Sequence, residues 1–452
     1  MIPTSVLDLI GNTPLVELQG FDTGPCRLFV KLETQNPGGS IKDRMARAMV
    51  EDAERRGALR PGGVMVEATA GNTGIGLALV AAAKGYRLIL TIPDKMSQEK
   101  IAHCRALGAE VRLCRSDVSK GHPDHYITLA EQIARETGAF AVNQFANPAN
   151  PRAHEETTGP EIWEQTGRAV DAVVCGVGSG GTLTGLSRYF ARVAPQVELV
   201  LADPAGSALA GLVTGEARPT GSYAVEGIGG DAIPPVADLA RVRHAFAIAD
   251  AESFETSRAL LKRAGLFGGS SSGTLAAAAL RYCRQQTRAK RVVTFLCDTG
   301  NKYLSKHFND YWMLDQGYLE RPQTGDLRDW FTRRYEEGAI LTVDPDDPLL
   351  TAFQRMRMAD ISQVPVVEQG RVVGILDESD LLLAVHGDPA RFRQPVRTAM
   401  TGRLETLPHT ASFDEVTRIL DAGKVALIMQ DGQFLGLITR TDLLNHLRRK
   451  LR

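Results

Sequence analysis

With 452 residues, the chain is long enough for two or three domains of ordinary size. Its 52 basic and 53 acidic side chains nearly cancel, and no basic tract is interleaved with aromatic residues, so the composition favours small-molecule partners over nucleic acid. The six cysteines lack C-x-x-C or Cys/His metal spacing, and no segment reads as a signal peptide or a membrane span. We therefore expect a cytoplasmic protein with reduced thiols, no metal site and no membrane association.

Short β-branched runs alternate with longer helical patterns from residue 28 to about residue 296. This alternation is typical of α/β proteins built on parallel sheets. The fold class predicted for this part is therefore α/β. The clearest predicted strands are 64–67, 88–92, 170–175, 198–202 and 292–296.

The first glycine-rich loop of interest, residues 36–44 (Asn-Pro-Gly-Gly-Ser-Ile-Lys-Asp-Arg), carries Lys42. Its proline and glycines fit a tight turn, and the apolar periodicity from Ile41 to Gly57 predicts a helix directly after it. Lys42 then lies in the first helical turn, where the positive dipole end and burial lower the pKa of an amine and make it a better nucleophile. Lys42 is the candidate Schiff-base lysine; the alternative is a solvated surface lysine.

The second loop, residues 69–74 (Thr-Ala-Gly-Asn-Thr-Gly), follows a predicted strand and precedes a predicted helix from Ile75 to Lys84. Backbone amides at such a helix start suit an anion, either a carboxylate or a phosphate. The Asn72 side chain could in addition donate to a phenolic oxygen. The alternative is an ordinary helix cap and turn.

The third loop, residues 176–182 (Gly-Val-Gly-Ser-Gly-Gly-Thr), again joins a predicted strand to a helix. It satisfies G-x-G-x-x-G, and Asp203 ends the next strand where a dinucleotide site would place its ribose-binding acid. Taken alone, the loop favours a dehydrogenase. A dinucleotide domain usually carries this motif on its first strand, however, and here two other glycine loops precede it, which favours a single phosphate.

One phosphate loop, one lysine and one carboxylate pocket together describe a site for pyridoxal phosphate. A further segment, residues 268–273 (Gly-Gly-Ser-Ser-Ser-Gly), offers hydroxyl groups for the ring nitrogen of that cofactor. A serine there leaves the pyridine largely unprotonated, so the ring is a weaker electron sink. The chemistry favoured is prompt loss of a β-substituent rather than transamination or racemisation.

The second half of the chain contains an internal repeat. Residues 374–382 return 62 positions later as residues 436–444, and each copy follows a helical segment and a strand pair closed by a glycine turn. Two copies of one supersecondary unit are expected to share a core. The predicted domains are residues 1–320, a linker at 321–334, and repeats at 335–392 and 393–452.

Residues from Thr4 to Leu319 resemble the fold-type II pyridoxal-phosphate enzymes of β-replacement, the cysteine synthase and cystathionine β-synthase family. The resemblance implies a fold like that of the tryptophan synthase β chain, with two parallel-sheet subdomains. The motifs that carry it are Ile10 to Leu15, the loops 36–44, 69–74 and 176–182, Gln144, Val225 to Gly229, and 268–273.

The resemblance implies a role for each matching residue. Lys42 would hold pyridoxal 5'-phosphate as a Schiff base, Asn72 would contact its ring oxygen, and Ser271, or the adjacent Ser270, would face its ring nitrogen. Its phosphate would be bound by Gly178, Ser179, Gly180, Gly181 and Thr182. The amino-acid substrate would be bound by Thr69, Ala70, Gly71, Asn72, Thr73, Gln144 and Gly227.

The C-terminal repeat resembles the paired CBS domains, a module that commonly binds adenosyl nucleotides. Thr439 and Asp442 match the residues that contact ribose in that module, whereas Asp377 replaces the threonine in the first copy. The resemblance implies one site for S-adenosylmethionine or an adenine nucleotide, with a pure dimerisation module as the alternative. It also implies a homodimer or higher homo-oligomer, and no haem is expected.

A catalytic half with this appendage points to the cystathionine β-synthase branch, in which serine and homocysteine give cystathionine and water through an aminoacrylate intermediate. The nearest alternatives are an O-acetylserine sulfhydrylase (cysteine synthase) and a cysteine β-lyase that releases hydrogen sulfide. A catalytically silent adenine-nucleotide sensor is the alternative from another class. Ala70, Phe145 and Gly230 stand where relatives carry hydroxyl groups, which leaves the second substrate open.

Overall fold

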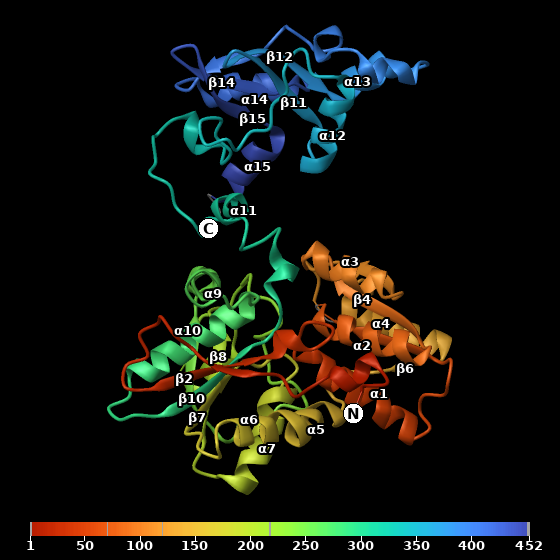
Figure 1. Ribbon diagram of the computed structural model, residues 1–452, viewed down its shortest axis with the longest axis vertical. Helices are drawn as coiled ribbons and strands as arrows, with labels where there is room; N and C mark the ends of the chain where they lie inside the picture. The colour runs from red at the N-terminus through yellow and green to blue at the C-terminus, as the bar shows by residue number, and fades with distance from the viewer. Residues whose placement is uncertain (1, 70, 120, 217, 450–452) are drawn as a thin grey trace. The chain divides into compact units, whose positions relative to one another are not determined.

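The computed structural model divides the chain into two compact units, Met1–Asn309 and Asp310–Arg452 (Figure 1). It describes residues 2–69, 71–119, 121–216 and 218–449. Within those ranges, no helix is long and apolar enough to cross a membrane.

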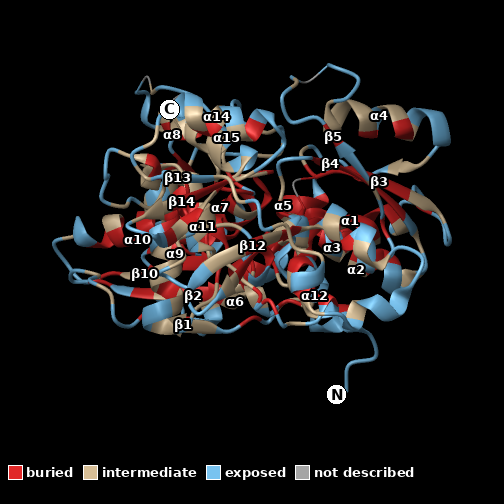
Figure 2. Cartoon of the chain, turned by 90° about the horizontal axis from the view of Figure 1, so that it is seen from above, coloured by how far each residue is buried: buried red, intermediate tan, exposed pale blue. Residues whose placement is uncertain are grey.

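The larger sheet of the first unit has the strand order β1-β2-β10-β7-β8-β9. β1 is antiparallel to β2, and all other neighbours in the sheet are parallel. The central strands are buried along almost their whole length, which explains why they read as unbroken apolar runs in the sequence (Figure 2). The strands are β1 (Leu15–Glu17), β2 (Arg27–Leu32), β7 (Ala172–Cys175), β8 (Glu198–Pro204), β9 (Val242–Ile248) and β10 (Arg291–Leu296).

The smaller sheet is parallel throughout, in the order β5-β4-β3-β6. Successive residues of β4 face opposite sides: Leu88 and Leu90 pack with α1, α2 and α3, and Ile89 packs with α4. The strands are β3 (Val64–Ala68), β4 (Arg87–Pro93), β5 (Glu110–Cys114) and β6 (Phe140–Ala141). The helices are α1 (Lys42–Arg55), α2 (Asn72–Lys84), α3 (Gln98–Ala106) and α4 (Tyr126–Thr137).

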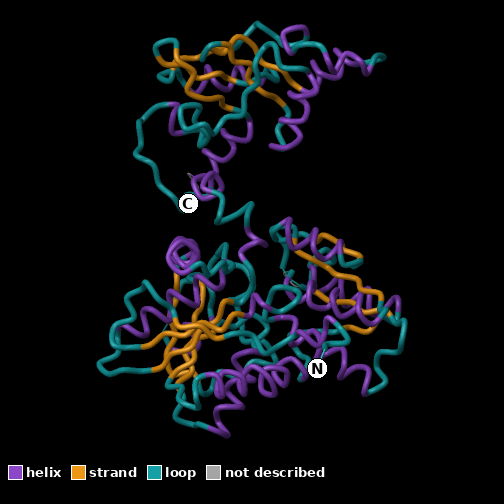
Figure 3. The backbone as a smooth tube through the Cα atoms, in the orientation of Figure 1, coloured by secondary structure: helices purple, strands orange, loops and turns teal. Residues whose placement is uncertain are grey.

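Helices also cover the larger sheet (Figure 3). α10 packs against β8 and β10 and against α9, while α7 packs against α5 and a π-helical turn, His154–Thr158. These helices are α5 (Ala149–Ala153), α6 (Gly159–Gln165), α7 (Gly181–Val193), α8 (Leu209–Thr214), α9 (Asp250–Ala264) and α10 (Ser270–Arg284). The predicted α/β fold with two parallel-sheet subdomains is confirmed.

The helix after the second loop begins earlier than the apolar periodicity predicts. Periodicity places its start at Ile75, but α2 begins at Asn72. Gly71 precedes it with a φ of +126°, which residues with a Cβ atom rarely adopt. The glycine therefore lets the chain turn directly into the helix. Asn72 and Thr73 therefore lie in the first helical turn.

The second unit contains the predicted repeat. Each copy has a helix, an antiparallel strand pair and a second helix, and β13 adds a parallel strand to the second copy. Each copy also has its own apolar cluster. The elements are α11 (Asp310–Asp315), α12 (Leu349–Ala359), β11 (Gln363–Glu368), β12 (Arg371–Asp377), α13 (Glu378–Val385), β13 (Thr406–Pro408), α14 (Phe413–Asp421), β14 (Ala426–Gln430), β15 (Gln433–Ile438) and α15 (Arg440–Arg449).

The segment 321–334, expected to be a linker, contributes to the core of the second copy. Leu327 and Phe331 are buried there with Val416 and Ile428. A Cβ at Gly436 would overlap the Phe331 ring, so the glycine makes room for it. Because most residues of the segment are polar, its sequence does not indicate that Leu327 and Phe331 are buried in a core.

Candidate active site

Five segments that follow the C-terminal ends of strands, together with the start of α10, meet around one cavity of the first unit. The five segments come after β2, β3, β7, β8 and β10. Ligands in parallel α/β proteins bind at this edge. Eight of the residues predicted from the sequence line the cavity: Lys42, Asn72, Gly178, Gly180, Gly181, Thr182, Gly227 and Ser271.

Lys42 is the first residue of α1, and its backbone N–H donates to Ser40 Oγ at 3.2 Å. Burial lowers the pKa of its amine, and the nearby Asp298 carboxylate works in the opposite direction. A lower pKa leaves more of the amine unprotonated and therefore nucleophilic. The environment of Lys42 is thus the one that a carbonyl-capturing lysine needs.

The start of α7 forms an anion-binding cradle next to Lys42. Gly180 has a φ of +89°, and a Cβ at Gly178 would overlap the Gly227 carbonyl oxygen, so both glycines let the backbone approach a ligand closely. The first amides of a helix have no acceptor within the helix, and those of α7 begin at Gly181. The cradle can therefore bind a phosphate.

The side chains of the phosphate loop differ in their partners. Thr182 Oγ1 lies 3.3 Å from His154 Nε2, and the other ring nitrogen of His154 lies 3.0 Å from Thr158 Oγ1. Burial lowers the pKa of His154 well below its usual value, so the imidazole is neutral. Ser179 Oγ instead accepts a hydrogen bond from Asn150 Nδ2 at 3.0 Å.

The serine loop places two adjacent hydroxyl groups in different environments. Ser271 lines the cavity together with Cys297, whereas Ser270 Oγ accepts a hydrogen bond from the Glu226 backbone N–H at 3.1 Å. Burial raises the pKa of the Cys297 thiol to about 12, so it remains protonated. The cavity therefore presents neutral hydrogen-bonding groups, not a carboxylate, at this end.

The predicted substrate residues gather at the start of α2. Thr69 Oγ1 accepts from the Gly71 N–H at 3.0 Å, and Thr73 Oγ1 donates to Gln144 Oε1 at 2.8 Å. Gln144 in turn donates to the Ala68 carbonyl at 3.2 Å. These three side chains and two backbone groups lie around the start of α2, next to Asn72 in the chain. Ala70 lies outside the described residues.

Sequence motifs missed three residues of this site. Cys297 and Asp298 directly follow β10, and Lys302 lies in the short helix after them, Gly300–Tyr303. Their position after the C-terminal end of a central parallel strand is the signal that could have found them. Cys297 lines the cavity, and Asp298 and Lys302 both hydrogen-bond to Asn72.

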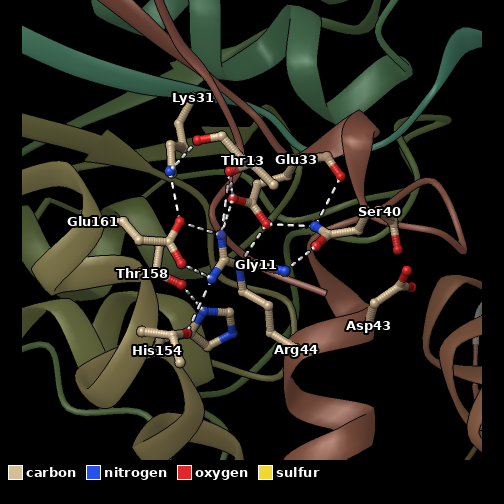
Figure 4. A network of polar contacts seen from close by, with 12 residues as sticks. Gly11, Thr13, Lys31, Glu33, Ser40, Asp43, Arg44, His154, Thr158 and Glu161 are labelled. Carbon is tan, nitrogen blue, oxygen red and sulfur yellow. Dashed lines mark hydrogen bonds and ion pairs between the residues drawn. The ribbon is translucent and has the colours of Figure 1, made fainter. Parts of the chain in front are cut away.

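A buried ion network supports the N-terminal end of α1 (Figure 4). Arg44 donates two hydrogen bonds to the Glu33 carboxylate, both at 2.8 Å, and two to the Glu161 carboxylate, both at 2.7 Å. Lys31 also donates to Glu161, at 2.7 Å. Burial alone would raise the pKa of Glu161, but Arg44 and Lys31 lower it to about 2, so the Glu161 carboxyl group is ionised between these two cations.

The acid that a dinucleotide site would need is engaged elsewhere. Asp203 is completely buried at the end of β8 and accepts a hydrogen bond from the Ala210 N–H at 2.8 Å. A ribose-binding acid has to be accessible to its ligand. Across the described residues there is also no cluster of three or more His, Cys, Asp or Glu side chains that could hold a metal ion.

In the second unit, Thr439 and Asp442 lie together at the start of α15. Thr439 donates to the Asp442 carboxylate through both its hydroxyl and, at 2.9 Å, its backbone N–H. Asp377 and Asp380 form the matching cap at α13 in the first copy. The two predicted nucleotide-binding residues thus also cap a helix.

The residues around the cavity fit pyridoxal phosphate. The glycine cradle excludes side chains where a phosphate would bind, Lys42 supplies an amine of lowered pKa, and Ser271 supplies a hydroxyl. Asn72 adds an amide to the same cavity. This donor set matches a phosphate, a carbonyl, a pyridine nitrogen and a ring oxygen.

The chain matches two known sequence families. Residues 6–298 match the family described as pyridoxal-phosphate dependent enzyme, and residues 336–387 and 396–449 match the CBS domain. The first match spans the whole cavity-forming part of the first unit. The second falls on the two copies of the repeat.

Curated relatives match over nearly the full length. Cystathionine beta-synthase of Apis mellifera is 33% identical over 98% of this chain and 90% of its own, and that of Dictyostelium discoideum is 34% identical over 99% and 93%. Cysteine synthase of Staphylococcus aureus is 41% identical, over 67% of this chain and 95% of its own.

Two solved structures each match about two thirds of the chain. O-ureido-L-serine synthase has a TM-score of 0.63 at 36% identity, over 68% of this chain and 95% of its own. A hydrogen sulfide-producing enzyme from Fusobacterium nucleatum has the same TM-score at 37% identity, over 67% and 100%. The chain therefore belongs to the pyridoxal-phosphate-dependent enzymes, as a lyase of the cystathionine β-synthase and cysteine synthase group that carries a C-terminal pair of CBS domains.

Proposed function

We propose that the protein replaces the β-hydroxyl group of serine with the thiol of homocysteine, giving cystathionine and water. The convergence of Lys42, Asn72, the phosphate cradle and Ser271 on one cavity carries the assignment to β-replacement. Pyridoxal phosphate, when bound, supplies a carbonyl that captures the substrate amine and a ring that accepts electrons from Cα. Lys42 would hold it through its amine, Asn72 at the ring oxygen, Ser271 at the ring nitrogen and residues 178–182 at the phosphate.

Lys42 has the central part in the proton transfers. Because burial lowers its pKa, a larger fraction of Nζ is unprotonated than in an exposed lysine, and the unprotonated amine can remove the α-proton of serine. The same atom then carries a proton that the departing hydroxide needs, because hydroxide is a poor leaving group. Acid–base assistance of this kind typically contributes about 10²–10⁴-fold in rate.

The cluster at the start of α2 would bind the substrate carboxylate. Its backbone amides lie at the positive end of a helix, and Thr69, Thr73 and Gln144 supply polar side chains. Gly71 and Gly227 complete the proposed substrate site. Because α2 also carries Asn72, substrate and cofactor would be held by one helical turn.

The length of the match supports serine and homocysteine over the alternatives. The two cystathionine beta-synthases cover both units, whereas the cysteine synthase and the hydrogen sulfide-producing enzyme cover only about two thirds of the chain. Steady-state rates separate the candidates. Higher kcat/KM with serine plus homocysteine than with O-acetylserine plus sulfide, or than for sulfide release from cysteine, is expected.

The reaction class is tested at Lys42. The Lys42→Ala variant is expected to lose turnover by at least about 10³-fold and to lack the visible absorbance of the bound cofactor, because Lys42 is the one lysine among the described residues that line the cavity. Lys262→Ala, on the exposed side of α9, is the matched control and should behave like the wild type. Retention of both turnover and absorbance by Lys42→Ala would refute the proposal.

The second unit has a proposed regulatory part. Thr439 and Asp442 would contact the ribose of S-adenosylmethionine or an adenine nucleotide, and such binding would change the activity of the first unit. Support comes from the match of residues 396–449 to the CBS domain. Calorimetry with these ligands, on the wild type and on Asp442→Ala, tests the site.

A further inference from the structure

The Asn72 side-chain amide is held at both of its ends by charged residues. Its Oδ1 accepts a hydrogen bond from Lys302 Nζ at 2.9 Å, and its Nδ2 donates to Asp298 Oδ2 at 2.7 Å. Rotating the amide by half a turn would place the NH₂ group against an ammonium and the oxygen against a carboxylate. The two partners therefore allow only one orientation.

That orientation decides what Asn72 can offer to the cavity. An amide nitrogen carries two N–H groups, and Asp298 accepts one of them. The second N–H remains for a ligand, while the amide oxygen is committed to Lys302. Asn72 lines the same cavity as Lys42, so it presents a donor there and selects for a hydrogen-bond acceptor.

Lys302 is fully committed to this arrangement. Its side chain is buried, and its three N–H groups donate to the Gly38 carbonyl at 2.9 Å, the Gly39 carbonyl at 3.2 Å and Asn72. Gly38 and Gly39 belong to the loop that carries Lys42. One buried ammonium therefore ties the lysine loop to the asparagine loop.

Asp298 is held just as firmly. Its Oδ2 also accepts from the Tyr303 hydroxyl at 2.8 Å, and its backbone carbonyl accepts from the Gly269 N–H at 3.0 Å. Its Oδ1 is buried and has no hydrogen-bond partner among the described residues. A buried carboxylate oxygen without a partner destabilises the fold, so packing alone gives no reason for an acid at this position.

We propose that Lys302 and Asp298 are positioning residues that fix the Asn72 amide so that it donates to the ring oxygen of pyridoxal phosphate. This inference rests on the proposed function, which supplies the cofactor. A hydrogen bond donated to that oxygen favours its ionised form. The two residues thereby set the pH at which the protonation state, and hence the visible absorbance, of the bound cofactor changes.

The test uses the full-length protein reconstituted with pyridoxal phosphate, and it compares Lys302→Met and Asp298→Ala with Asn72→Ala. Each of the three is expected to shift the pH midpoint of the absorbance change by about one unit in the same direction, and to weaken cofactor binding about tenfold. Asp298→Asn keeps an oxygen that accepts from Asn72 and Tyr303, and should restore both values toward the wild type. Lys262→Met, far along α9, is the control.

A double-mutant cycle separates positioning from general damage. If Lys302 acts through Asn72, Lys302→Met adds no further shift of the midpoint in an Asn72→Ala background. An equal shift in both backgrounds would overturn the inference, and so would unchanged midpoints in Lys302→Met and Asp298→Ala. Circular dichroism identifies a variant that fails to fold, in which case the other variant of the pair decides.

The proposed function and this inference fail in different ways. A wild-type protein that binds no pyridoxal phosphate, or that keeps its absorbance when Lys42 is replaced, contradicts the proposed function. If the wild-type protein has the expected absorbance but Lys302→Met and Asp298→Ala leave the pH midpoint of the absorbance change where it is, only the inference is contradicted.

Discussion

Two carboxyl groups next to the active-site loops are held partly protonated by burial. Burial raises the pKa of Glu67, in β3, to about 7, against the smaller effect of the backbone N–H groups of Gln144 and Asn143. Burial also raises the pKa of Asp43, next to Lys42, to about 7. The folded protein thus keeps both protons at pH values where the unfolded chain has already lost them.

This difference makes stability depend on pH in a defined direction. Between about pH 4.5 and 7 these two carboxyl groups bind more protons in the folded state than in the unfolded state, so their contribution to the free energy of unfolding falls as pH rises. Each unit of difference between the two pKa values contributes about 1.4 kcal/mol. Glutamine has no titratable proton. As pH rises from about 4.5 to 7, the free energy of unfolding of Glu67→Gln, measured by urea titration, is therefore expected to fall less than that of the wild type.

Asp43→Asn should remove the contribution of Asp43 to this pH dependence. In the Glu67→Gln/Asp43→Asn double variant, the free energy of unfolding should vary least with pH. Identical slopes for the wild type and Glu67→Gln would show that the Glu67 carboxyl group is ionised in the folded protein. The measurement is best made on each variant at the same ionic strength, because salt screens exposed charges more than buried ones.

At the scale of elements, the Arg44 network joins β2, α1 and α6 (Figure 4). Arg44 lies two residues after Lys42, so the network fixes the end of α1 from which the reactive amine projects. The side chains of Arg44 and Glu33 are almost completely buried. Removing the guanidinium leaves the buried Glu33 carboxylate without its ion-pair partner, whereas Glu161 keeps Lys31.

Arg44→Met is therefore expected to lower the free energy of unfolding by about 3–5 kcal/mol in denaturant titrations. Arg44→Met/Glu33→Gln, which also removes the unpaired carboxylate, should recover part of that loss. Arg55→Met, at the exposed end of the same helix, is the matched control and should change stability by less than about 1 kcal/mol. If Arg44→Met/Glu33→Gln is no more stable than Arg44→Met, an unpaired buried carboxylate is not the cause of the lost stability.

At the scale of the whole molecule, the two units have separate apolar clusters. Two apolar clusters of the first unit lie within residues up to 153, and its larger sheet contributes further buried residues such as Val173, Leu199 and Phe295; the clusters of the two repeats lie within residues 327–443. The cysteine synthase and the two solved structures match over 95–100% of their own length and over only 67–68% of this chain. We therefore predict that the first unit can fold by itself.

A chain ending at Asn309 is expected to fold, to bind pyridoxal phosphate and to keep kcat within about tenfold of the full chain without added nucleotide. It should lose any response to S-adenosylmethionine or adenine nucleotides. Paired measurements on the full and shortened chains, with and without each ligand, give the comparison. A shortened chain that still responds to the ligand would place the nucleotide site in the first unit.

The sequence by itself determined the local features. Glycine turns, apolar periodicity and the repeat depend on neighbouring residues, so the α/β fold, the helix after Lys42 and the paired strands of the second unit could be predicted. The start of α2 at Asn72 and the buried anchors Leu327 and Phe331 could not, because a glycine conformation and a distant core decide them.

Only the tertiary structure decided which groups surround the predicted site residues. Asp298 and Lys302 lie 226 and 230 positions from Asn72 in the chain, and Glu161 lies 117 positions from Arg44. No local pattern links residues so far apart, because the fold brings them together by placing the ends of several parallel strands at one edge. The sequence predicted the reactive amine and its loops, and the fold determined how each polar group there is oriented and charged.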